Sequence, residues 1–341
     1  MRALVLTEYK RLQVREVPEP VAGDADVLVR VRACGICGSD VHGFDGSSGR
    51  RVPPAVMGHE AAGVVERVGS AVRGLSRGDR VTFDSTVSCG RCEFCRHGRP
   101  NLCDARRVLG VSCAEYRQDG AFAEYVAVPA HIVYRLPDEV SFEHAAMVEP
   151  VSVAVHAVSR APTPAGTAVV VGAGTIGLLV IQALRAAGTP RVIAVDVDEG
   201  KLELARRLGA ELGLNPASAD VPAEVRRRTE GGAEVALECV GATEPIKTAV
   251  ACVRKGGAVV LVGNVTPAIQ LPLQAVVTGE ITLLGTCASS GEYPRAIELL
   301  RTGKVDVRPL ITTVAPLEEG PAMFERLYAR ESGLMKVVLQ P

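Results

Sequence analysis

The chain has 341 residues, of which 47% are hydrophobic and 23% are charged. It is longer than a single hydrophobic core usually grows, so we expect two domains. Its 38 lysine and arginine residues balance 39 aspartate and glutamate residues, which excludes a global field that would attract nucleic acid or an anionic membrane surface.

No segment carries a clear export or membrane signal. Residues 1–10 lack a basic region followed by an apolar run and a cleavage site. Residues 161–184 are uncharged, but the glycines and prolines among them argue against a membrane span. We therefore expect a cytoplasmic protein with no membrane and no nucleic-acid partner, whose thiols stay reduced.

The first 150 residues are predicted to be rich in β-strands. Short alternating runs at 27–31 and 62–68 are separated by Gly, Pro and Asp, as in strands joined by turns. A small barrel-like domain is the expected result.

From about Pro164 onward the pattern changes to strands that alternate with helices, which predicts a parallel sheet and an α/β fold. The predicted strands are 168–171, 192–195, 235–237, 259–262 and 281–284, and the predicted helices are 178–187 and 201–208. The last segment, 293–341, has two helix-like stretches and a closing strand at 336–339 that could return to the first domain.

Four cysteines lie within fifteen residues of one another: Cys89, Cys92, Cys95 and Cys103. Four thiolates on one short loop can surround a tetrahedral zinc and leave no open position, so we predict a structural zinc site. Four free buried cysteines are one alternative. A zinc knuckle that binds nucleic acid is another, but Phe94 is the one aromatic residue available there for stacking.

A dinucleotide-binding motif follows the predicted strand 168–171. Its glycines, Gly172, Gly174 and Gly177, let the backbone turn tightly and approach a pyrophosphate at the start of a helix. Asp196 ends the next strand, where a carboxylate can accept both ribose hydroxyls and would repel a 2′-phosphate. We therefore predict NAD rather than NADP. A tight turn without a ligand is the alternative.

Further residues are assigned to the same cofactor site. Lys201 is a candidate ribose partner. Thr175 and Ile176 lie between Gly174 and Gly177, where the predicted helix begins, and Val262 ends a later strand.

A third group of candidate ligands is dispersed along the chain. Cys37 lies in a Cys-x-x-Cys pair with Cys34, and His59 and Glu60 follow about twenty residues later. Ligands from separate loops can leave one coordination position open for a substrate, as a catalytic metal requires. The alternatives are a redox pair of cysteines and a histidine that only makes hydrogen bonds.

In the order and content of these motifs, the sequence resembles the zinc-containing medium-chain dehydrogenase/reductase family. The resemblance implies a GroES-like catalytic domain at 1–152 and 288–341, with a structural zinc lobe at 89–103, and a Rossmann dinucleotide-binding domain at 153–287. It also implies a catalytic zinc on Cys37 and His59, with Glu60 next to the metal. Glu149 matches a glutamate of the sorbitol-type dehydrogenases in this family, so its carboxylate or a water molecule would complete the coordination of the catalytic zinc. An acid at a helix N-terminus before Pro150 is the alternative role for Glu149.

The resemblance implies oxidation of an alcohol, with zinc as a Lewis acid and hydride transfer to the nicotinamide. Ser39 would take the proton and His42 would pass it to solvent; a turn-capping serine and a surface histidine are the alternatives. His156 is expected to pack rather than act. Where sorbitol dehydrogenases carry an arginine that binds the polyol, this chain has Ala288.

We therefore expect an NAD-dependent zinc dehydrogenase that converts a secondary alcohol, such as a sugar alcohol, polyol or vicinal diol, into a ketone. The alternatives are oxidation of an amino alcohol, as in L-threonine 3-dehydrogenases, and a non-catalytic module that binds zinc and a dinucleotide. The family implies a homodimer or homotetramer, and the apolar segments 276–277 and 281–284 could extend a sheet across a dimer.

Overall fold

The computed structural model describes residues 1–113, 116–162 and 165–341. The predicted change of pattern at Pro164 lies outside these residues. By their internal contacts the residues form two compact units. Unit 1 comprises 1–149, 293–301 and 307–341, and unit 2 comprises 150–292 and 302–306.

Unit 1 is built on a seven-stranded sheet in the order β10-β6-β5-β3-β18-β17, in which β9 also pairs with β3. Its strands are β3 (Asp26–Gly35), β5 (Glu60–Val68), β6 (Arg80–Phe83), β9 (Tyr125–Pro129), β10 (Val133–Arg135), β17 (Ile311–Pro316) and β18 (Lys336–Gln340). A three-stranded sheet and a two-stranded sheet complete the unit. The three-stranded sheet contains β1 (Arg2–Glu8), β2 (Arg11–Glu16) and β4 (Ala55–Val56). The two-stranded sheet contains β7 (Thr86–Val87) and β8 (Arg107–Val108).

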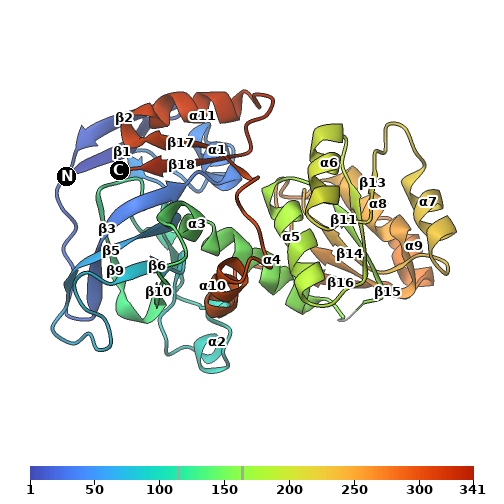
Figure 1. Cartoon of the computed structure of the whole chain (residues 1–341), viewed down its shortest axis with the longest axis horizontal. Coiled ribbons are helices and arrows are strands. Elements are labelled where there is room, and N and C mark those ends of the chain that lie inside the picture. The colour runs from blue at the N-terminus through green and yellow to red at the C-terminus, as the bar shows by residue number, and fades with distance from the viewer. Residues whose placement is uncertain (114–115, 163–164) are drawn as a thin grey trace. The chain divides into compact units, whose positions relative to one another are not determined.

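The end of the chain returns to the beginning within unit 1. Strand β18 pairs antiparallel with β3, so the predicted return of the closing strand is confirmed. Figure 1 shows β17, β18 and helix α11 in red beside the blue N-terminal strands. The helices of this unit are α1 (Gly38–Phe44), α2 (Glu93–Arg96), α3 (Phe142–Ala146), α10 (Tyr293–Arg301) and α11 (Gly320–Tyr328). Phe122 and Phe324 meet edge-on in its core, at 5.7 Å between ring centroids.

Unit 2 is a six-stranded parallel sheet in the order β13-β12-β11-β14-β15-β16. Its strands are β11 (Thr167–Val171), β12 (Arg191–Val195), β13 (Leu212–Leu214), β14 (Ala233–Glu238), β15 (Val253–Leu261) and β16 (Thr282–Gly285). Every residue of β11 is buried, as expected for a central parallel strand covered on both faces. The predicted α/β fold with a Rossmann-type parallel sheet is confirmed.

The helices of unit 2 follow the predicted alternation with the strands. They are α5 (Thr175–Ala186), α6 (Glu199–Arg207), α7 (Val221–Arg228), α8 (Thr243–Cys252) and α9 (Leu273–Thr278), and α4 (Val148–Arg160) begins at the boundary between the units. Asp198 caps α6, since its side chain accepts a hydrogen bond from the backbone of Lys201. Among the described residues, no helix is both long and apolar enough to cross a membrane.

Candidate active site and metal sites

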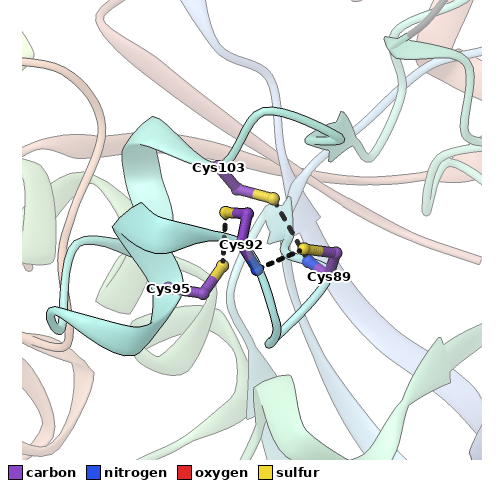
Figure 2. A group of neighbouring side chains, drawn as sticks. All are labelled: Cys89, Cys92, Cys95 and Cys103. Carbon is purple, nitrogen blue, oxygen red and sulfur yellow. Dashed lines mark hydrogen bonds between the residues drawn. The ribbon is translucent and has the colours of Figure 1, made fainter.

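The four clustered cysteines converge on one point in unit 1, and their sulfur atoms lie within 4.8 Å of one another. Figure 2 shows the four side chains turned toward a common centre from α2 and the loops on either side of it. Zinc–sulfur bonds of about 2.3 Å make this spacing suitable for one ion. Cys89, Cys92, Cys95 and Cys103 therefore fit the closed zinc site that the sequence predicts.

Backbone N–H groups already point at two of these thiols. The amides of Cys92 and Arg91 donate to the sulfur of Cys89, at 3.3 and 3.5 Å, and the amide of Cys89 donates to the sulfur of Cys103 at 3.3 Å. The hydrogen bonds to Cys89 lower its pKa to about 6, whereas burial raises the pKa of Cys95 and Cys103. Because zinc binds the thiolate, Cys89 is the member of the group that the metal-free loop prepares for a metal.

A second group joins residues that are dispersed in the sequence. Cys37 precedes α1, His59 immediately precedes β5, and Glu60 is the first residue of β5. Their ligand atoms also lie within 4.8 Å of one another, and His59 and Glu60 are buried. A sulfur, a nitrogen and an oxygen donor from separate elements match the mixed ligand set of a catalytic zinc better than a closed structural one.

Asp40, on α1, links two members of this second group. Its Oδ1 lies 3.4 Å from Nδ1 of His59, and its Oδ2 accepts a hydrogen bond from the backbone of Cys37 at 3.2 Å. Nδ1 of His59 has no hydrogen-bond partner among the described residues, so this contact with Asp40 is electrostatic, and it leaves the other ring nitrogen for a metal. Asp40 thus orients His59 and Cys37 together.

Glu60 faces a cation from the far end of the chain. Nζ of Lys336, the first residue of β18, donates to the two carboxylate oxygens of Glu60 at 2.6 and 2.9 Å, and both side chains are buried. Burial alone would lower the pKa of Lys336, but Glu60 outweighs it and the pKa is raised. This ion pair holds the Glu60 carboxylate next to Cys37 and His59.

Glu149 lies on the first turn of α4, outside the group formed by Cys37, His59 and Glu60. It accepts a hydrogen bond from the Ser85 hydroxyl at 3.1 Å. Burial, with the negative charges of Glu60 and Asp84, raises the pKa of Glu149 to about 7 against the opposing effect of His59. Its predicted role as a metal ligand stays a prediction.

The two residues of the expected proton relay both lie on α1. Ser39 and His42 are exposed, and the Ser39 hydroxyl accepts a hydrogen bond from Nη2 of Arg51 at 3.3 Å. His156 also lies on α4, later in the helix than Glu149. Its Nδ1 pairs with the Glu292 carboxylate at 2.8 Å.

The glycine motif of unit 2 turns the chain sharply between β11 and α5. Gly172 has a φ of +95°, a left-handed conformation that favours glycine. A Cβ on Gly177 would lie 1.8 Å from the carbonyl oxygen of Gly172, so only glycine lets α5 start this close to the turn. A Cβ on Gly174 would meet open space, which leaves room for a ligand at the start of α5, beside Thr175 and Ile176.

Asp196 lies where the sequence predicts it, directly after β12 and against the glycine turn. Its Oδ2 accepts a hydrogen bond from the amide of Ala173 at 2.7 Å, and its Oδ1 accepts one from Asp198. Lys201 lies on α6, and Val262 follows β15. All these residues lie near the carboxyl ends of parallel strands, where Rossmann-type sheets bind dinucleotides.

Four contributors to unit 1's site were not predicted from the sequence: Asp40, Arg51, Ser85 and Lys336. A signal existed for Lys336, since a lone lysine in an otherwise apolar closing strand needs a buried acidic partner. For Arg51 and Ser85 the sequence gives no signal that we can identify.

Comparison with known proteins places both units in one family. The model of the alcohol dehydrogenase GroES-like domain matches residues 23–138, and that of the zinc-binding dehydrogenase matches residues 175–302. L-idonate 5-dehydrogenase of Vitis vinifera is 38% identical over 90% of this chain and 85% of its own length. Sorbitol dehydrogenase of Bacillus subtilis is 35% identical over 100% of this chain and 97% of its own length.

A solved zinc-binding dehydrogenase from Sinorhizobium meliloti, bound to NADP, is 34% identical and covers 100% of this chain and 99% of its own, with a TM-score of 0.90. These matches confirm the predicted enzyme class, a zinc- and dinucleotide-dependent dehydrogenase. The chain therefore belongs to the zinc-containing medium-chain dehydrogenase/reductase family.

Proposed function

We propose that the protein oxidises a secondary hydroxyl group of a sugar alcohol, another polyol or a vicinal diol to a ketone, with NAD as the hydride acceptor. The observation that carries the proposal is the gathering of Cys37, His59 and Glu60 into a mixed donor set that is separate from the four-cysteine group. The names of the sorbitol and L-idonate relatives support a polyol substrate.

The residues of unit 1 have distinct roles in this proposal. Cys37 and His59 hold the catalytic zinc, with Glu60 beside it and Glu149 or water as a further ligand, and the four-cysteine group holds a second zinc. When bound, the catalytic zinc supplies the Lewis acidity that makes an alcohol easier to deprotonate. Ser39 accepts the hydroxyl proton as it gives up its own toward His42, and His42 passes a proton to solvent.

The domain assignment belongs to the same proposal. Residues 1–152 and 288–341 form the catalytic domain, and residues 153–287 bind the dinucleotide. The two compact units, whose boundaries fall close to these positions, support this assignment.

The preference for NAD rests on Asp196. Its carboxylate is held in place by two backbone amides, so a 2′-phosphate would bring negative charge against an acid that cannot easily move away. The S. meliloti protein was solved with NADP bound, so the proposed preference of this chain for NAD depends on Asp196 and not on that relative. We expect kcat/KM to be at least about tenfold higher with NAD than with NADP, which corresponds to about 1.4 kcal/mol; a higher value with NADP would contradict the assignment.

The substrate is tested with a panel of sugar alcohols, vicinal diols, L-threonine and simple primary alcohols, followed by NADH formation. We expect the highest kcat/KM on a polyol or vicinal diol. A highest value on L-threonine would support the amino-alcohol reading instead. No turnover on any alcohol by zinc-loaded protein would favour a non-catalytic zinc and dinucleotide binder.

We also infer a cytoplasmic homodimer or homotetramer. Strand β16 forms an edge of the sheet in unit 2, and Leu273 and Val277 of the neighbouring α9 are each 64% exposed. An exposed sheet edge with apolar residues beside it supports pairing with a second copy.

A further inference from the structure

Arg51 is a buried arginine beside the mixed donor set. Its side chain is 4% exposed, although arginine is rarely buried unless it is paired. Its Nη2 donates to Oδ1 of Asp40 at 2.9 Å and to the hydroxyl of Ser39 at 3.3 Å. Since this nitrogen carries two hydrogens, one guanidinium group can serve both acceptors at once.

The contact with Asp40 connects Arg51 to both proposed zinc ligands. Oδ1 of Asp40 lies between Arg51 and His59, and Oδ2 accepts from the backbone of Cys37. A histidine that binds zinc is neutral, so it cannot balance the charge of a fully buried carboxylate. Arg51 supplies that charge through its ion pair with Oδ1 of Asp40 at 2.9 Å, and both side chains are buried.

The helix that carries Ser39 and Asp40 is shaped around this arginine. A Cβ on Gly43, one turn further along α1, would lie 2.7 Å from Cγ and 2.8 Å from Cδ of Arg51. A glycine at this position therefore leaves the space through which the arginine side chain reaches Asp40.

We propose that Arg51 is a positioning residue of the catalytic-zinc site: it holds His59 and Cys37 for the metal through Asp40, and it orients the hydroxyl of Ser39. The link to the metal stands on the contacts above, and the link to Ser39 rests on the proposed function.

The metal link is tested by zinc release to a chelator from the zinc-loaded Arg51→Met and Arg51→Lys variants. The matched control is Arg50→Met, which removes an exposed arginine next in sequence. Loss of a partner behind a metal ligand typically costs 10- to 100-fold in metal affinity. We expect one zinc to leave Arg51→Met at least about tenfold faster than from the wild type, while the four-cysteine zinc is unaffected.

The lysine variant keeps the charge and should release zinc more slowly than the methionine variant, and Arg50→Met should behave as the wild type. Release from Arg51→Met at the wild-type rate would overturn the proposal. So would equal acceleration in Arg50→Met.

Gly43→Ala provides a second variant that leaves the arginine in the sequence. The added methyl group should displace the Arg51 side chain and accelerate zinc release. It should have a much smaller further effect in an Arg51→Ala background, because Cγ and Cδ are then absent and only Cβ of residue 51, at 3.0 Å, remains in contact. Equal effects of Gly43→Ala with and without Arg51 would contradict the proposed contact.

The link to Ser39 is tested by measuring kcat at saturating zinc, with the alcohol that the wild-type enzyme oxidises. Arg51→Met and Ser39→Ala should each lower kcat, and the double variant should lose no more than the worse single variant, since both act through one hydroxyl. Fully additive losses would overturn this part. If the wild type oxidises no alcohol, the proposed function fails, whereas the zinc-release result still decides the role of Arg51 at the metal.

Discussion

Asp40 shows how one buried carboxylate can organise a metal site. It contacts the backbone of Cys37, the ring of His59 and the guanidinium of Arg51. Burial alone would raise the pKa of Asp40, but a protonated His59, as in the metal-free protein, and Arg51 outweigh this effect and hold the pKa well below its usual range. With zinc on a neutral His59, Arg51 is the cation that stays paired with this carboxylate.

Ser39 is the residue whose proposed role can be separated most directly from metal binding. Ser39→Ala removes the hydroxyl that accepts the substrate proton, so we expect kcat for alcohol oxidation to fall by about 100-fold with zinc content unchanged. Turnover is followed by NADH formation across a pH series, and zinc is measured on the same samples.

Ser76→Ala, in an exposed loop of unit 1, is the control and should leave kcat unchanged. Wild-type turnover of Ser39→Ala at every pH would remove the relay from the account.

The contacts of Glu292, in unit 2, predict that the stability of the protein depends on pH. Partial burial would raise its pKa, but the hydrogen bond with His156 and that from the amide of Ser290 lower it below its ordinary value of 4.5. A carboxylate with a depressed folded pKa contributes stability above pH 4.5, and this contribution is lost as the pH falls through the folded pKa. Glu292→Gln should therefore destabilise the protein near neutral pH and have a smaller effect in acid.

The measurement is denaturant unfolding of both proteins between about pH 3 and pH 6. The exposed Glu230→Gln serves as the control and should give a small difference that does not vary with pH. A Glu292→Gln effect that is constant over this range would show that the carboxylate contributes nothing through its ionisation.

At the scale of elements, the sequence predicted five of the six strands of unit 2 and the helices α5 and α6, because these are encoded locally, but it did not predict β13, α7, α8 or α9. The apolar run of β11, the glycine turn and the amphipathic α5 follow one another without gaps, and the observed ends lie within a few residues of those predicted. The carboxyl ends of parallel strands also meet at one edge, so the position of Asp196 against the glycine turn follows from the strand pattern.

Two strands show where local pattern fails. Strand β15 begins at Val253, six residues before its predicted start. Gly256 and Gly257 interrupt the apolar run in the sequence, but the strand accommodates them at a register shift against β14. Strand β17 (Ile311–Pro316) was not predicted; it is a half-exposed edge strand whose one partner among the described strands is β18. Its conformation depends on that pairing more than on its own residues.

The exposed α9 gives a prediction about assembly. If a second copy pairs along the β16 edge, Val277→Lys would place a charge in the interface and should shift the protein toward the monomer. The molar mass in solution, measured by light scattering after size-exclusion chromatography, tests this.

Val314→Lys, on the edge strand β17 of unit 1, is the control, since Val314 is 45% exposed and lies far from α9 in the sequence. An assembly unchanged by Val277→Lys, or lost with Val314→Lys, would contradict the proposed interface.

At the scale of the whole molecule, the sites of unit 1 depend on segments that are remote in the sequence. Lys336 reaches Glu60 across 276 residues. Over a shorter span, Arg51 in the segment after α1 folds back to Asp40 and Ser39 on that helix. Motif spacing indicated the candidate ligands because ligand types are distinctive, but it could not indicate the residues that contact them, which only the folded chain brings together. The order of motifs along the whole chain indicated the family, which the comparisons confirm.

The central claim is that a zinc ion held by Cys37 and His59 activates a secondary alcohol, while the zinc of the four-cysteine loop does not. The direct test is a titration of zinc into metal-free protein, with bound zinc and polyol-dependent NADH formation measured at each step, in the wild type and in His59→Ala. We predict that activity requires two zinc ions per wild-type chain, and that His59→Ala binds one zinc and is inactive. Full activity with one zinc per chain, or in His59→Ala, would contradict the account.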